Sequence, residues 1–425
     1  MTFPHWPFFY GWVIVAVAFV GSGIGSGVAI WGASVFVIPM TEELGWSRAA
    51  FFAAFTVRAV LGGISAPLLG PLLDTRNGPR LLAMGGAVVL TGSMVLLRYT
   101  DHLWQFILLY GVLGAVADAG NGFNVSQNIV PKWFVRRRGR ALGVSTMGVG
   151  MGALVFPGSV SALVDAFGWR DAWVYFGLLA GGVTFVLALF VRTRPEDVGL
   201  LPDGDAVPPI PMGPLVDAPG HVGIVEERSL SRAEALRTPA FWMLLLSFGF
   251  VGFGIMGFQA NWLPYLRESG FSSTEASAGI AIYGGLSGLS RPLWGLMGEH
   301  IAPRYLLAAS TVITAFSILL FLNVRTVPAL SGYMVLAGIF MGGYLILRAL
   351  LASNYFGRAH IGSVNGALRP LEMGTGALSP LLFGALYDMN GDYTIAFIVA
   401  GAGWFLAGCI VLLARPPIVE AASPF

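Results

Sequence analysis

The sequence predicts an all-α membrane protein with twelve transmembrane helices in two pseudo-symmetric halves of six. Its composition, its long apolar stretches and an internal repeat predict this fold class. Of 425 residues, 56% are hydrophobic and 11% are charged, whereas soluble proteins carry about 25% charged residues. So few charges cannot cover a water-facing surface, so we expect lipid to surround much of the chain.

Twelve stretches approach the roughly 20 mostly apolar residues that a spanning helix needs. They are 10–39, 50–73, 81–99, 103–130, 140–164, 171–192, 240–266, 275–298, 304–323, 328–352, 361–387 and 393–414. Two of them, 103–130 and 361–387, carry polar residues inside, which are costly in lipid and point to function.

One long segment divides the chain. It is rich in Pro, Asp and Glu, a composition typical of linkers. We therefore expect an N-terminal half over 1–192, a cytoplasmic linker over 193–239 and a C-terminal half over 240–425. Inside the linker, Ser231 and Glu234 have capping-box spacing, which predicts a short helix.

Basic residues predict the orientation. With the N-terminus in the cytoplasm, fifteen of the 24 Lys and Arg residues fall in inner loops and five in outer loops. The positive-inside rule then places both termini in the cytoplasm, in a multi-pass protein of the plasma (inner) membrane. Four arginines remain within spans: Arg58, Arg291, Arg348 and Arg369.

The two halves repeat at an offset of 223 residues. The matched pairs are Gly139 and Gly362, Gly143 and Gly366, Pro157 and Pro380, Asp165 and Asp388, and Gly168 and Gly391. Turn residues and helix-breaking prolines thus recur at the same place in each half. A parallel repeat of six spans predicts a binding site between the halves, near the bilayer midplane.

Other classes of protein are disfavoured. A single cysteine, Cys409, argues against a disulfide framework, and the five histidines lack metal-binding spacing, so we expect no metal and no cofactor. A net charge of +2 gives no reason to expect nucleic acid. Neither a nucleotide-binding motif nor a catalytic triad occurs, which predicts that the chain is not an enzyme. We expect a monomer.

The loop after the second span reads GPLLDTRNGPR, over residues 70–80. It resembles the loop motif of the major facilitator superfamily, with one extra residue between Asp74 and Gly78. A weaker version, GLMGEHIAPR, occupies 295–304. The resemblance and the charges predict a conformational latch, formed by Asp74, Arg76, Arg80, Glu299 and Arg304. The alternative is that these are ordinary positive-inside loop charges.

Within that superfamily, the chain resembles the monocarboxylate porters and the oxalate/formate exchangers. The segments that carry the resemblance are YGWVIVAVAF (10–19), WFVRRRGRALGVSTMGVGMG (133–152), FGWRDAW (167–173) and RTRPEDVGL (192–200). It implies the major facilitator fold and transport of small organic anions. The chain departs from the animal porters in two places: no lysine occurs between Tyr10 and Val37, and Ser287 replaces their acid. Their proton-coupling arrangement therefore cannot be carried over intact.

Ionisable residues deep in the spans need a partner or a water-filled cavity, since a charge at the bilayer centre costs ~3 kcal/mol or more. Six such residues occur: Arg58, Asp118, Arg291, Arg348, Arg369 and Glu372. Four cations against two carboxylates leave an excess of positive charge, which an anionic substrate would balance.

Two arginines are candidate substrate ligands. Arg291 precedes Pro292, as the substrate-binding arginine of the family does, and we expect it to bind a carboxylate; the alternative is a structural arginine paired with a neighbouring helix. Arg369 and Glu372 share one face of their helix. They form either a plain ion pair or a proton site, in which protonation of Glu372 frees Arg369 for substrate.

The fourth span carries a run of polar residues. We expect Asn121 and Asn124 to line the cavity and contact substrate, although single asparagines in membrane helices often join helices instead. Asp118 is the second candidate for the proton carrier. Arg58 is a candidate extracellular gate, and Arg348 is expected to snorkel to the inner surface.

The leading functional hypothesis is proton symport of a small monocarboxylate. The expected partners are therefore a small organic anion, a proton and the lipid bilayer. Exchange of a dicarboxylate such as oxalate remains open, since Arg291 and Arg369 could supply two facing cations. Efflux of drug-like compounds would need a larger apolar cavity. A transporter-like receptor would need an additional soluble domain.

Overall fold

The computed structural model describes residues 8–118, 120–205 and 229–417. The helices of the first half are α1 (Gly11–Ser26), η1 (Gly27–Trp31), η2 (Ala33–Phe36), α2 (Val37–Leu44), α3 (Arg48–Leu69), η3 (Gly70–Asp74), α4 (Gly78–Leu96), η4 (Leu97–Tyr99), α5 (Leu103–Phe106), η5 (Ile107–Leu113), α6 (Gly114–Asp118), α7 (Gly122–Asn128), α8 (Val130–Trp133) and α9 (Arg138–Phe190). Three short helices follow: η6 (Pro195–Val198), η7 (Pro202–Gly204) and α10 (Arg232–Leu236).

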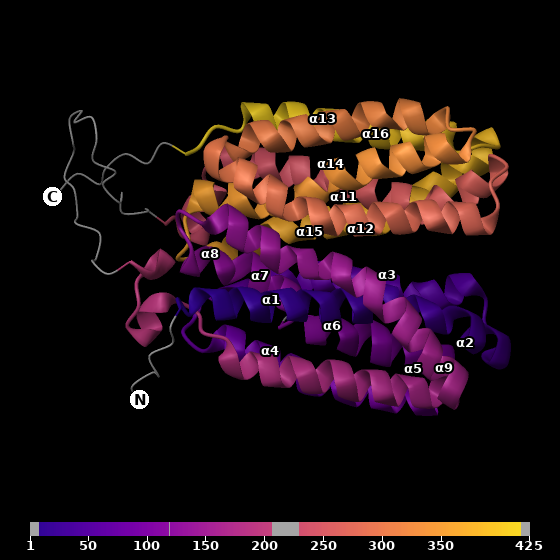
Figure 1. The fold of residues 1–425 in the computed structure, drawn as a ribbon, viewed down its shortest axis with the longest axis horizontal. Coiled ribbons are helices and arrows are strands. Elements are labelled where there is room, and N and C mark those ends of the chain that lie inside the picture. Colours follow the sequence, from indigo (N-terminus) through magenta and orange to yellow (C-terminus); the bar gives the residue numbers. More distant parts are fainter. Residues whose placement is uncertain (1–7, 119, 206–228, 418–425) are drawn as a thin grey trace.

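The second half contains α11 (Pro239–Glu268), α12 (Ser273–His300), α13 (Pro303–Leu322), α14 (Val327–Phe356), α15 (Ile361–Asn390) and α16 (Thr394–Leu413). The two halves form two groups of helices that lie side by side with their axes roughly aligned (Figure 1). Residues 193–205 and 229–238 lie at one end of the bundle, which we call the linker end; the opposite end is the far end.

Twelve spans can be traced through the described residues. Eight helical stretches are long and apolar enough to cross a membrane. One of these, α9, contains two spans, because the backbone leaves helical geometry at Gly168 (φ 76°). The other three are the broken run α5–α8, α12 and α15, in which chain breaks or polar side chains weaken the apolar signal. The expected fold class is confirmed, and these three spans carry four of the six deep charges, at Asp118, Arg291, Arg369 and Glu372.

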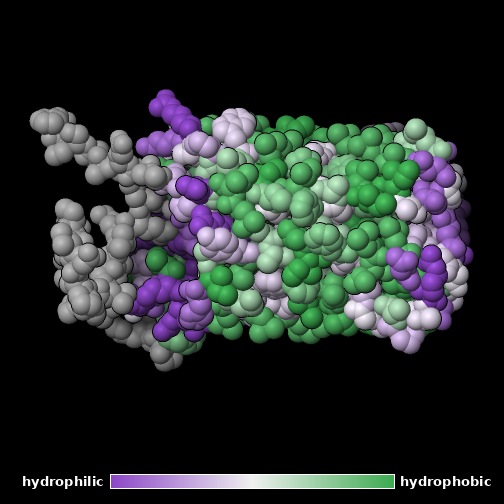
Figure 2. Space-filling model, turned by 90° about the horizontal axis from the view of Figure 1, so that it is seen from above, coloured by the Kyte–Doolittle hydropathy of each residue, from purple (hydrophilic) through white to green (hydrophobic). Residues whose placement is uncertain are grey.

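On the face that Figure 2 shows, apolar side chains cover the middle of the molecule and hydrophilic residues gather at its two ends. This is the pattern that a bilayer requires of a protein that crosses it. The chain is therefore an integral multi-pass membrane protein.

The repeat reappears in backbone geometry. Gly168 and Gly391 end the matched fifth and eleventh spans with φ of 76° and 77°, a left-handed region that favours glycine. Capping also follows the sequence, since Ser231 and Glu234 form the expected capping box at the start of α10.

The halves meet through close glycine contacts toward the linker end. A side chain at Gly139 or Gly143 would collide with Gly295 or Pro292 of α12, and matched contacts join Gly362 and Gly366 of α15 to Gly70 and Ala66. Hydrogen bonds join the halves at several levels between the linker end and Arg291, among them Gly362 with Asp74, Arg138 with Asn354 and Arg291 with Thr146. The halves are therefore closed against each other over this half of the bundle.

Candidate functional site

The fourth span is broken where its polar residues lie. The helix α6 ends at Asp118, and α7 begins at Gly122 with Asn121 as its N-cap. The side-chain oxygen of Asn121 accepts a hydrogen bond from the backbone N–H of Asn124 at 3.0 Å. The Asn124 amide donates to the Asp118 carbonyl at 2.6 Å. The span expected over 103–130 is present but interrupted, because asparagine side chains replace helical hydrogen bonds at this point.

Asp118 pairs with Arg58 inside the first half. The Arg58 guanidinium donates from Nε and Nη2 to the two carboxylate oxygens, each at 2.8 Å, and stands 4.9 Å from the centre of the Tyr110 ring. Arg58 is 5% exposed. The arginine joins helices of one half in this conformation, and its role as an extracellular gate stays a prediction. The two oxygens of Asp118, the second candidate proton carrier, are held by this arginine.

Glu372 is bound by the neighbouring helix α14. One carboxylate oxygen lies 2.9 Å from Nη2 of Arg348, and the other accepts a hydrogen bond from the Tyr344 hydroxyl at 2.9 Å. Arg348 stacks over the Phe248 ring and is 3% exposed, so the expectation that it snorkels to the surface is wrong. The physical reason is that the buried Glu372 carboxylate is a closer partner for the Arg348 guanidinium than water at the membrane surface.

Arg291 lies where α12 packs on α9 of the other half. Its Nη1 donates to the Thr146 carbonyl, the side chain is buried, and its buried Nε has no hydrogen-bond partner among the described residues. Among the described residues no ion pair joins Arg291 to a carboxylate. The guanidinium retains the capacity to bind an anion.

Arg369 lies in a small pocket between the halves. The pocket has a volume of about 50 Å³, and its polar lining comprises Ser65, Asp118, Asn124, Asn128, Asn365 and Arg369. Asn121 lines a different pocket with Arg58. The structure thus brings the substrate candidates Asn124 and Arg369 together with Asp118, and it places Arg291 at a different helix interface.

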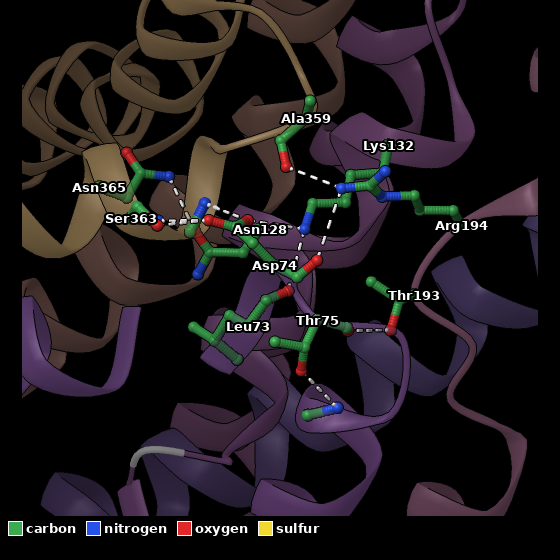
Figure 3. A network of polar contacts seen from close by, with 12 residues as sticks. Leu73, Asp74, Thr75, Asn128, Lys132, Thr193, Arg194, Ala359, Ser363 and Asn365 are labelled. Carbon is green, nitrogen blue, oxygen red and sulfur yellow. Dashed lines mark hydrogen bonds and ion pairs between the residues drawn. The ribbon is translucent and has the colours of Figure 1, made fainter. Parts of the chain in front are cut away.

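Asp74 joins the halves at the linker end (Figure 3). Its carboxylate accepts hydrogen bonds from the first backbone N–H groups of α15, at Gly362 (2.9 Å) and Ser363 (2.8 Å), and from the Ser363 hydroxyl. A negative charge at a helix N-terminus is stabilising, since unpaired N–H groups and the helix dipole converge there. The Nζ of Lys132, 2.8 Å from Asp74, completes the cluster.

Glu299 makes the matched contact in the other direction. Its carboxylate accepts hydrogen bonds from the backbone N–H and the Nε of Arg140, at 2.8 and 2.9 Å, in the first turn of α9. Each half therefore contributes an acid that caps a helix of the other half.

The arginines expected in the latch lie elsewhere. Arg76 faces Asp197 at 3.7 Å and is 73% exposed, while Arg304 bonds to the adjacent Tyr305. Arg80 is partly buried at the start of α4, and the acids take Lys132 and Arg140 as their cationic partners instead. The reason is position: short helices and tight loops bring the helix ends of one half, not the loop arginines, against each acid.

Sequence reasoning did not identify Lys132 as a functional residue; it counted only as one of several cations in the inner loops. It is 1% exposed and donates to the Leu73 carbonyl as well as to Asp74. Burial lowers the pKa of Lys132 from its ordinary value, and the Asp74 carboxylate opposes that shift.

Comparison with known proteins identifies a family and several relatives of this chain. The sequence model of the Major Facilitator Superfamily matches residues 19–267 and 252–424. The oxalate:formate antiporter of Oxalobacter formigenes is 27% identical over 391 residues, which cover 90% of this chain and 86% of the antiporter. Monocarboxylate transporter 2 of Mesocricetus auratus is 24% identical, covering 95% of this chain and 84% of that protein.

A solved structure shares the fold. The human organic anion transporter MFSD10 (TETRAN) superimposes with a TM-score of 0.69 at 16% identity, covering 94% of this chain and 99% of that one. The resemblance inferred from the loop and span motifs is thereby confirmed.

Proposed function

We propose that this chain, which belongs to the Major Facilitator Superfamily, is a secondary transporter that carries small organic anions across a membrane by alternating access. The proposed activity moves the solute without changing its covalent bonds. The names of two similar proteins, an oxalate:formate antiporter and a monocarboxylate transporter, support an anionic carboxylate as the substrate class.

The main support for the proposal is the balance of charges inside the bundle. The two deep carboxylates each hold an arginine, Asp118 with Arg58 and Glu372 with Arg348. Arg291 and Arg369 add two further positive charges, so the six side chains together carry a net charge of +2. A bound carboxylate would lower the cost of keeping those charges out of water.

In this account Arg291 is the principal ligand. Its guanidinium fork matches two carboxylate oxygens, and its Nε–H has no acceptor among the described residues. Arg369 supplies the second cation and Asn124 a polar contact in the pocket that they share. Asn121 remains a proposed contact of lesser weight, since its side chain also caps α7.

Proton coupling is proposed for Glu372, with Asp118 as the second candidate. Protonation of Glu372 would remove the partner of Arg348 and raise the positive charge near Arg369, which favours an anion. This links the arrival of a proton to the arrival of substrate. Exchange of a dicarboxylate is the second candidate function, and the two central cations together with the antiporter relative support it.

We further propose that the linker end faces the cytoplasm of a plasma (inner) membrane, in line with the positive-inside bias. The acid-capped helix ends at Asp74 and Glu299 would then hold the cytoplasmic side shut in this conformation.

The test is uptake by proteoliposomes that contain the purified protein, with a panel of labelled monocarboxylates and dicarboxylates, with and without a pH gradient. Uptake driven by an inward proton gradient supports symport, and rapid counterflow without a gradient supports exchange. If no carboxylate is transported under either condition while an apolar cation is, the anion proposal is wrong.

A further inference from the structure

We infer that Asn128 and Asn365 form the inner gate of the transport path, between the arginine site and the charged cluster at Asp74. The inference rests on the proposed function, because a gate presupposes a path. It assigns a role to two side chains that the sequence did not single out together.

The two asparagines occupy the middle level of three matched levels along α7–α8 and α15. Going toward the linker end, the first helix run presents Asn124, Asn128 and Lys132, each four residues apart and so on a similar face. The facing helix α15 presents Arg369, Asn365 and Ser363. The level of Asn124 and Arg369 belongs to the candidate site. The level of Lys132 and Ser363 belongs to the Asp74 cluster (Figure 3).

The middle level is a direct contact between the halves. The Asn365 amide donates to the Asn128 side-chain oxygen at 3.0 Å, and the Asn128 amide donates back to the Asn124 carbonyl at 2.9 Å. Asn365 is 3% exposed and Asn128 4%. The pocket that holds Arg369 continues past this pair to Leu73 and Gly362 beside the Asp74 cluster. Separation of the pair would widen this route from Arg369 toward the linker end.

The pair leaves some of its hydrogen-bond acceptors unpaired, which is unusual for a permanent structural contact. The side-chain oxygens of Asn365 and of the adjacent Gln127 are buried with no hydrogen-bond partner in the described residues. Buried acceptors of this kind are normally paired in a static core. An unpaired oxygen here favours opening, since water that enters the gap can supply the missing donor.

The pocket that the pair lines is small. Its volume of about 50 Å³, lined by both asparagines and Arg369, holds about three to five water molecules. Neutral amides suit such a constriction, because their N–H groups can donate to a passing carboxylate without holding it as a second fixed charge would.

The experiment measures access to the pocket from the linker side. In a Cys409→Ser background, Ser65→Cys places a reporter in the pocket; Ala66 packs on Gly366, so the reporter lies on the site side of Asn365. Inside-out vesicles are treated with a membrane-impermeant maleimide, without added anion. The variants are Asn128→Ala with Asn365→Ala, Asn128→Leu with Asn365→Leu, and the matched control Asn390→Ala, an exposed asparagine at the far end of α15.

The double alanine variant should label roughly two- to tenfold faster, the range expected from losing one neutral hydrogen bond. The double leucine variant should label no faster than the parent, because apolar side chains plug the gap, while anion exchange falls about tenfold or more. The control should match the parent.

Two results would contradict the gate. One is unchanged labelling in the alanine variant. The other is equal acceleration in the leucine variant, which would mean that the pair only holds the halves together. If the double alanine variant does not fold, Asn365→Ser should give a smaller acceleration, and no acceleration also overturns the gate. Labelling needs no substrate. If the alanine variant labels faster while the parent transports no carboxylate, the proposed function is refuted and the role of the pair as a barrier between the pocket and the linker side stands.

Discussion

At the scale of single residues, the deep arginines differ in the kind of partner they have. Arg58 and Arg348 each face a carboxylate within their own half, whereas Arg291 donates to a backbone carbonyl of the other half. Sequence reasoning found all the deep charges but not their partners. Glu372 lies three residues from Arg369, yet its carboxylate reaches α14, since a long side chain can turn to any helix that packs beside it.

Arg291→Lys keeps the positive charge and removes the guanidinium fork. Transport should fall about 10- to 100-fold, the range expected for losing a charge-assisted pair of hydrogen bonds. Counterflow in proteoliposomes measures the effect, with size-exclusion elution in detergent as the check on folding. Unchanged counterflow would remove Arg291 from the site.

Glu372→Gln mimics the protonated carboxyl group. It should impair net proton-coupled uptake more than exchange, because the proton step is lost while the arginine site persists. Net uptake and counterflow are compared in the same vesicles. Equal loss of both would point to Asp118 or to a structural role for the pair with Arg348.

Asp118→Leu should cost about 3–5 kcal/mol of stability, because it leaves the Arg58 guanidinium buried without its carboxylate. The double variant Arg58→Leu with Asp118→Leu should recover much of that loss. Thermal unfolding in detergent measures both. A single variant as stable as the parent would show that the ion pair contributes nothing to the fold.

At the scale of elements, the sequence predicted span positions well and span continuity poorly. Most helix ends lie within a few residues of their expected limits, because apolar runs and turn residues mark them directly. The break before α7 went unrecognised, although Asn121 between two glycines is a typical capping signal. The latch acids were predicted, but their partners are helix ends of the opposite half, which only the packing of helices brings near.

Asp74→Asn removes the charge that caps α15. It should shift the equilibrium about tenfold toward a conformation open at the linker end, since hydrogen bonds to a charged acceptor are the stronger ones. Spin labels at Thr75→Cys and Ala359→Cys, with Cys409→Ser, report the distance between the halves. The control Arg76→Gln, an exposed arginine outside this contact, should leave the distances unchanged. An unaltered distance distribution for Asp74→Asn would contradict the latch.

At the scale of the whole molecule, an apolar belt encloses a small set of buried charges with an excess of cations. The repeat gives each half an acid and a pair of glycines that close against the other half at the linker end. Such matched contacts suit a protein in which two halves rock about a central site.

The central claim is that the excess positive charge serves an anion, and its most direct test is a paired uptake measurement. Each labelled carboxylate is compared with its neutral amide, acetate with acetamide, lactate with lactamide and oxalate with oxamide, in proteoliposomes of the parent and of Arg291→Gln. We predict that the parent transports at least one carboxylate and not its amide, and that Arg291→Gln abolishes this preference. Equal uptake of acid and amide, unchanged by Arg291→Gln, would contradict the account.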